Sequence, residues 1–148
     1  MDTCIPMQDE YVNLLGKAVY SFAYYEGTIV DILSYLDVNF RQRYYREWAL
    51  TAGNLKNKFK EILNNQQKYI LELNQCLNDF SDLIDKRNRL IHSHPITDKE
   101  DGQILNYQAD VKKSIHDFKW KKDEVIEFIK EINDRERVAS ELLEKLRC

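Results

Sequence analysis

The chain contains little glycine and proline, with four glycines and two prolines in 148 residues. Tight turns and hairpins rely on these two residue types, so their scarcity argues against a β-sandwich or a β-barrel. Cysteine is also sparse, because Cys4, Cys76 and Cys148 are odd in number and lie far apart. This spacing argues against a disulfide framework or a zinc site and favours a reducing cytoplasm. We expect a helical fold that needs no metal and no cofactor.

Charge of one sign is not in excess, since 25 acidic residues face 22 basic ones and the net charge is −3. No global field therefore attracts nucleic acid or anionic lipid, and any contact with RNA must be local. No apolar run is long enough to span a bilayer, and the first residues lack the basic and then apolar pattern of a signal peptide. We expect a cytoplasmic protein without membrane partners.

Apolar residues recur at spacings of three and four, as in amphipathic helices with one buried stripe. The first stripe is predicted to consist of Val12, Leu15, Val19, Phe22, Ile29, Leu33 and Leu36. A short helix is expected after Thr51, and longer helices are expected over 70–91 and over about 121–146. Residues 1–148 are thus predicted to form one all-α domain, a bundle of four to five helices.

Pro95 sets the end of the helix predicted over 70–91, which must stop near residues 92–95 because proline cannot continue a helix. The following stretch, 97–117, contains Asp101-Gly102 and is expected to be the only long irregular region. Its segment 103–107 allows one short extended piece.

Two charges interrupt the apolar stripes. Glu26 stands where the first stripe requires a hydrophobic residue, and Arg87 stands between the apolar residues of the helix over 70–91. An unpaired buried guanidinium is costly, so Arg87 needs either an acidic partner or a wet cleft that binds anions. We hypothesise that the two helices pack together and that Glu26 holds Arg87.

Polar residues gather near the end of the same helix. Asp85, Asn88, Arg89 and His92 share one side of it, because they are three or four residues apart. Imidazole can gain or lose a proton near neutral pH, and arginine can bind phosphate. A base for the ribose 2′-hydroxyl and a cation for the phosphate are what RNA cleavage requires.

The segment from Arg87 to His92 reads R-N-x-x-x-H at the end of an amphipathic helix and resembles the signature of the HEPN (higher eukaryotes and prokaryotes nucleotide-binding) superfamily. The preceding Leu-Ile-Asp-Lys, residues 83–86, also resembles the approach to that motif. The resemblance implies a homodimer in which two motif helices face one cleft. Catalytic members of the family are metal-independent endoribonucleases, so it also implies this activity. By motif position Arg87 would stabilise the phosphorane, His92 would act as general base or acid, and Asn88 would orient the histidine or the phosphate. Many such proteins are toxins, with or without a cognate antitoxin, or defend against phage.

Alternative interpretations remain for each of these residues. Non-catalytic members of the family bind nucleotides or partner proteins. Arg87 alone fits a buried ion pair, and His92 alone fits a cap at the helix C-terminus. His94 occupies the place where a subset of the family has a tyrosine, and it either assists phosphate binding or lies in a solvated loop. The basic and aromatic stretch from Arg41 to Trp48 fits base stacking or an ordinary helix edge.

Overall fold

The computed structural model describes residues 7–47, 51–111 and 114–148 of the chain. The elements within this part follow one another as α1 (Asp9–Leu36), α2 (Phe40–Glu47), α3 (Ala52–Leu63), α4 (Ile70–Ile91), β1 (His94–Asp98), β2 (Gly102–Val111), β3 (Ser114–Trp120) and α5 (Lys122–Arg147). The predicted helical bundle is confirmed in this coarse form.

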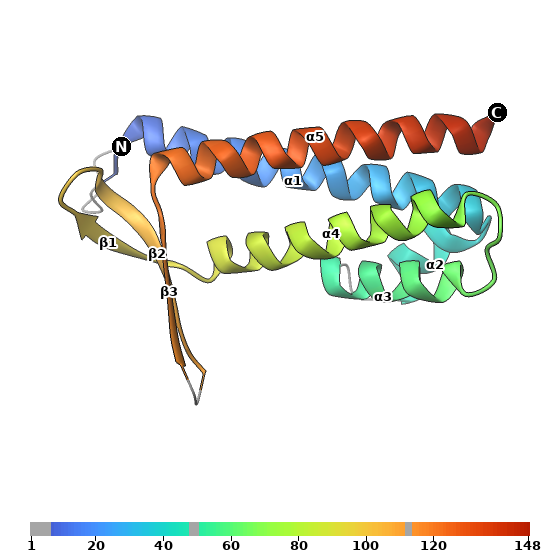
Figure 1. The fold of residues 1–148 in the computed structure, drawn as a ribbon, viewed down its shortest axis with the longest axis horizontal. Helices are drawn as coiled ribbons and strands as arrows, with labels where there is room; N and C mark the ends of the chain where they lie inside the picture. The colour runs from blue at the N-terminus through green and yellow to red at the C-terminus, as the bar shows by residue number, and fades with distance from the viewer. Residues whose placement is uncertain (1–6, 48–50, 112–113) are drawn as a thin grey trace.

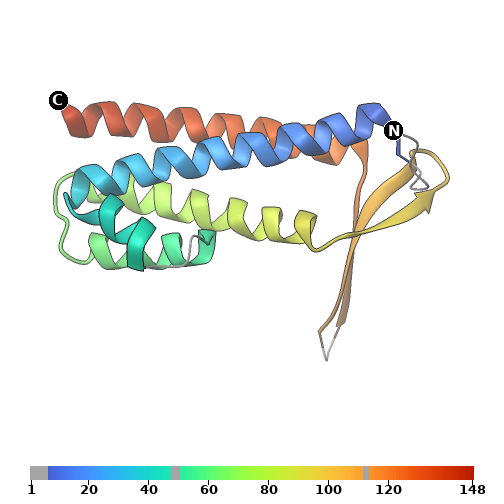
Figure 2. The same ribbon diagram turned by 180° about the vertical axis from the view of Figure 1, so that it is seen from behind.

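The long helices lie side by side along the molecule (Figures 1 and 2). The first and last, α1 and α5, run in the same direction and pack against each other over much of their length. The helix α4 runs the opposite way, with α3 beside it and the short α2 at the end distant from the sheet. The motif at the C-terminus of α4 therefore lies at the end of the bundle where the sheet begins.

The all-α class is only partly correct, because the three strands that follow α4 form an antiparallel sheet in the order β1-β2-β3. Register pairs such as Ile96 with Ile104 and Tyr107 with Phe118 place apolar and aromatic side chains opposite one another. Such cross-strand pairs stabilise a sheet and explain why this segment is not the irregular region that was expected. The outer part of the β2–β3 hairpin projects away from the helices (Figure 1).

A tight turn between β1 and β2 makes this sheet possible. The carboxylate of Asp98 accepts hydrogen bonds from the backbone N–H groups of Glu100 and Asp101, both at 3.1 Å. Gly102 then has a φ of +74°, a conformation that a side chain would disfavour. The Asp101-Gly102 pair is the sequence signal for this turn, and the alternation that follows it is the signal for the strand.

Helix ends agree with the sequence predictions. The side chain of Thr51 accepts a hydrogen bond from Asn54 N at 3.2 Å and so caps α3. The helix α4 ends at Ile91, and the chain is extended from His94 onward, as the residue before Pro95 requires.

The stripe predicted for the first helix is wrong in its N-terminal half. Val12 and Val19 are 42% and 55% exposed, whereas Tyr11, Ala18 and Tyr25 are buried. The prediction passed over the tyrosines and so began one position late on the helix. Tyrosine rings supply core area in place of the valines, which remain on an open face of α1.

Tyr11 connects the bundle to the sheet. Its hydroxyl donates a hydrogen bond to Trp120 O at 2.6 Å and accepts one from Leu105 N at 2.9 Å. Burial raises the pKa of this phenol, so it remains protonated and can donate. One side chain thus fixes β2 and the end of β3 against the start of α1.

No helix among the described residues is long and apolar enough to cross a membrane.

Replacing Tyr11 by phenylalanine should lower the free energy of unfolding by about 1–3 kcal/mol, because two backbone groups lose their partner. Urea unfolding followed by circular dichroism measures this change, and amide exchange at Leu105 should accelerate. The matched control is Tyr20→Phe, since Tyr20 is exposed on the same helix. Equal stability of the two variants would contradict the bridging role of Tyr11.

Candidate functional site at the end of helix α4

The last turns of α4 present side chains to two cavities on different sides of the helix. We call the first the arginine cavity, of about 150 Å³; its lining is Val19, Phe22, Ala23, Glu26, Arg87 and Ile91. The second is the histidine cavity, of about 450 Å³; its lining is Asp82, Asp85, Lys86, Asn88, Arg89, His92 and Tyr107.

In the arginine cavity, the guanidinium carbon of Arg87 lies 4.9 Å from the centre of the Phe22 ring. This is a cation–π contact, which stabilises a partly desolvated guanidinium without neutralising its charge. The Nε of Arg87 is buried and has no hydrogen-bond partner among the described residues. Arg87 is therefore a fixed positive charge that is open to an anion.

Glu26 lines the same cavity but forms no direct ion pair with Arg87 in the part of the chain that the structure describes. Burial raises the pKa of the Glu26 carboxyl, and the nearby charge of Arg87 lowers it by a smaller amount. The hypothesis that Glu26 holds Arg87 is thus correct about their proximity, whereas the expected salt bridge is not formed. No direct ion pair in the described part of the chain therefore neutralises the charge of Arg87.

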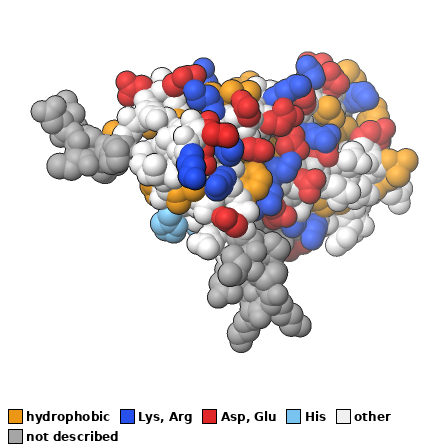
Figure 3. Space-filling model, turned by 60° about the vertical axis from the view of Figure 1, so that its left-hand side comes forward, with side chains coloured by type: hydrophobic (Ala, Val, Ile, Leu, Met, Phe, Trp, Pro, Cys, Tyr) orange, Lys and Arg blue, Asp and Glu red, His pale blue; other side chains and the backbone are white. Residues whose placement is uncertain are grey.

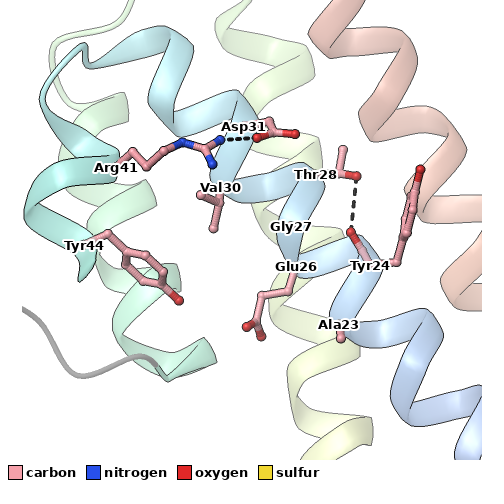
Figure 4. A pocket seen from close by; sticks show the side chains of 9 residues that line it. All are labelled: Ala23, Tyr24, Glu26, Gly27, Thr28, Val30, Asp31, Arg41 and Tyr44. Atoms are coloured by element: carbon pink, nitrogen blue, oxygen red, sulfur yellow. Dashed lines mark hydrogen bonds and ion pairs between the residues drawn. The ribbon is translucent and has the colours of Figure 1, made fainter.

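Glu26 also lines a groove between α1 and α2, of about 520 Å³ (Figure 4). Its carboxylate points away from α1 into this groove, and the ring of Tyr44 lies on the α2 side. Arg41 belongs to the basic and aromatic stretch and is ion-paired with Asp31, so its charge is already balanced. Trp48 of that stretch lies outside the described residues. The groove supplies aromatic surface beside the arginine cavity but no free cation among its described lining residues.

The histidine cavity brings together four residues of the predicted cluster, namely Asp85, Asn88, Arg89 and His92. His92 follows the last residue of α4, and its backbone N–H donates to Asn88 O at 3.0 Å. Its imidazole is exposed and can reach a ligand in the cavity. The opposite wall contains Tyr107 of β2, which sequence reasoning missed because the strand was not foreseen.

Arg89 and Lys86 form the side of the histidine cavity toward α5. Lys86 is held by Glu131 through two contacts of 2.6 and 2.7 Å. The guanidinium of Arg89 lies 5.8 Å from the centre of the Phe118 ring, and its buried Nε has no partner among the described residues. Arg89 therefore resembles Arg87 in being held by an aromatic ring rather than by an acid.

His94 lies apart from both groups. It is exposed on β1 opposite Asn106, and it lines neither the arginine cavity nor the histidine cavity. His94 is thus solvated, as one of its two interpretations expected, but it lies on a strand instead of in a loop.

The geometry separates the two central residues of the motif. Arg87 and His92 are five positions apart, which turns them by about 140° around a helix. In a single chain, the cation of Arg87 and the imidazole of His92 consequently face different cavities. A reaction that needs both must recruit a second copy or move the end of α4.

Acidic and basic side chains are intermixed over the face of the molecule seen in Figure 3, which agrees with local rather than global attraction of an anion. No group of three or more histidine, cysteine, aspartate or glutamate side chains in the described ranges is placed to hold a metal ion.

Comparison of the chain with protein-family models, with curated proteins and with solved structures finds no match.

The raised pKa of Glu26 predicts how its substitution changes stability with pH. Because the carboxyl is more readily protonated in the folded state, its contribution to the free energy of unfolding decreases as pH rises from its ordinary pKa through the higher folded value. Glu26→Gln should therefore become progressively more stable than the wild type as the pH rises above about 4.

Chemical unfolding at several pH values measures this difference, with Glu141→Gln as an exposed control on α5. If Glu26→Gln instead lost stability over this range, Glu26 would be the acidic half of an ion pair with Arg87.

Proposed function

We propose that this chain is a HEPN-like, metal-independent endoribonuclease of the cytoplasm, of toxin or phage-defence type, with a composite site across a homodimer. The ribose 2′-oxygen attacks the adjacent phosphorus while a base accepts the hydroxyl proton. The bond from phosphorus to the 5′-oxygen breaks, and an acid gives that oxygen a proton. The products are a 2′,3′-cyclic phosphate and a 5′-hydroxyl, and no water or metal enters this step.

The observation that carries the proposal is the unneutralised guanidinium of Arg87. A half-buried arginine usually pairs with a carboxylate, yet Arg87 is held by the Phe22 ring and forms no direct ion pair among the described residues, although Glu26 lines the same cavity. Such a cation suits the dianionic phosphorane of RNA cleavage, because it is positioned before the charge develops.

The remaining roles follow from the histidine cavity. His92 supplies the imidazole of this cavity, and it serves as general base or acid. Asn88 lines the same cavity and orients the imidazole or a phosphate oxygen. Arg89 adds a second phosphate contact, and Asp85 balances the local charge.

A homodimer supplies what one chain lacks. Apolar side chains beside Arg87 are open to solvent, with Val19 55% and Ile91 50% exposed. A second copy that covers this face would bury them and bring its own motif helix to the arginine cavity.

Light scattering should show a dimer at micromolar concentration, and a monomer would count against the composite site.

The alternative is a non-catalytic module that binds a nucleotide or a partner protein, such as an antitoxin. The separation of Arg87 from His92 within one chain favours this alternative if no dimer forms. Arg89 and Asn88 would then hold a phosphate without cleaving RNA.

Cleavage of total RNA and of transfer RNA in EDTA tests the proposal. The wild type should leave cyclic-phosphate ends, and His92→Ala should reduce the rate by about 10²–10⁴-fold through loss of proton transfer. Arg87→Ala should reduce it by about 10²–10³-fold through loss of charge stabilisation. Both variants must retain the circular dichroism spectrum and the oligomeric state of the wild type.

The matched control is His94→Ala, because His94 is exposed two residues beyond His92 and lines neither cavity. It should cut at nearly the wild-type rate. Equal activity of His92→Ala and the wild type would rule out the proposed role of the histidine.

A further inference from the structure

A third cavity, of about 190 Å³, lies between α4, β3 and α5. Three aromatic rings form part of its lining, those of Phe118, Trp120 and Phe128. The Phe118 and Trp120 rings meet edge to face at 4.9 Å between centroids, and Trp120 lies 5.4 Å from Phe128. We call it the tryptophan cavity. Trp120 and Phe128 are each 3% exposed and belong to the core, so the half-buried Phe118 ring supplies the aromatic face on which a flat base can stack.

Trp120 brings an unused hydrogen-bond donor to this cavity. Its side chain is 3% exposed, and its indole Nε1–H has no partner among the described residues. A buried indole N–H ordinarily finds an acceptor, so this donor is left unsatisfied at the cavity wall and would gain from a ligand whose acceptor reached it. The Nε–H of Arg89, which also lines the cavity, is a second buried donor without a partner there.

The α5 side of the cavity supplies acceptors. Glu124, Glu127 and Glu131 lie along one side of the helix and line the cavity together. Glu131 is engaged by Lys86 at 2.6 Å, whereas Glu124 and Glu127 form no ion pair in the described part of the chain. Two carboxylates thus remain to accept hydrogen bonds from a ligand.

Guanine is the base whose edges match this arrangement. It presents the N1–H and N2–H₂ donors to a carboxylate, and its O6 and N7 accept from groups such as the Trp120 indole. Adenine places an acceptor, N1, where a carboxylate would repel it. Pyrimidines have a smaller ring for stacking on the aromatic surface. The combination of free carboxylates and free donors therefore discriminates in favour of guanine.

The tryptophan cavity adjoins the histidine cavity, because Arg89 and Lys86 line both. A nucleotide with its base in the former can place a phosphate beside Arg89, Asn88 and His92. We infer that the tryptophan cavity is a guanine-binding subsite that selects the nucleotide next to the cleaved bond. This inference rests on the proposed ribonuclease function for its role, but the binding itself does not require cleavage.

Binding of the four nucleoside 3′-monophosphates to the purified protein in EDTA tests the inference by equilibrium dialysis. Guanosine 3′-monophosphate should bind at least about tenfold more tightly than the adenosine, cytidine and uridine forms. The double variant Glu124→Gln/Glu127→Gln should lose this preference, since an amide no longer offers two acceptor oxygens. The matched control is Glu141→Gln/Glu144→Gln, which changes the same charge on exposed positions of the same helix.

Three results would overturn the inference: equal binding of the four nucleotides, no binding of any, or an undiminished guanosine preference in the Glu124→Gln/Glu127→Gln variant. The outcome is separable from that of the cleavage assay. RNA cutting without guanosine preference would refute the subsite alone, whereas guanosine preference in a protein that cuts no RNA would refute the ribonuclease alone.

Discussion

The ring of Phe22 connects the core of the molecule to its candidate site. It packs against Phe80 of α4 at 6.4 Å between centroids, and the neighbouring Tyr25 of α1 packs against the same Phe80 at 5.6 Å, so these contacts join α1 to α4. The same ring holds the guanidinium of Arg87. The position of Arg87 is thus set by core packing rather than by an acid. A residue held in this way keeps its charge for a ligand, whereas a salt bridge would have cancelled it.

The sheet completes the site from the other side. Tyr11 fixes β2 and β3 to the start of α1, and this places Tyr107 and Phe118 beside the end of α4. Arg89 lies against Phe118, so both arginines of the motif are held by aromatic rings from neighbouring elements. The helix turns these two arginines to different sides, which divides the end of α4 into separate cavities. The proposed chemistry depends on a second copy of the chain because of this division.

Sequence periodicity was sufficient for the helical framework and for the end of α4, because spacing of apolar residues and proline act locally. It was insufficient for the sheet, since strand pairing such as Ile96 with Ile104 depends on contacts between segments. Charge and motif identified the candidate residues. They did not indicate how these residues are distributed between the cavities. Spacing indicated that Glu26 and Arg87 are neighbours, whereas the cation–π contact with Phe22 depends on how α1 and α4 pack. Tyr107 entered the site only through the unforeseen strand.

The most direct test of this account is complementation between two inactive copies. Arg87→Ala and His92→Ala chains with different tags are co-expressed, mixed dimers are isolated by sequential affinity purification, and RNA cleavage is measured in EDTA. Each homodimer should be inactive, and the mixed dimer should recover about half of the wild-type rate because one of its two symmetric sites keeps both residues. Mixed dimers as inactive as either parent, or copies that do not associate, would contradict a composite site built from Arg87 and His92 of different chains.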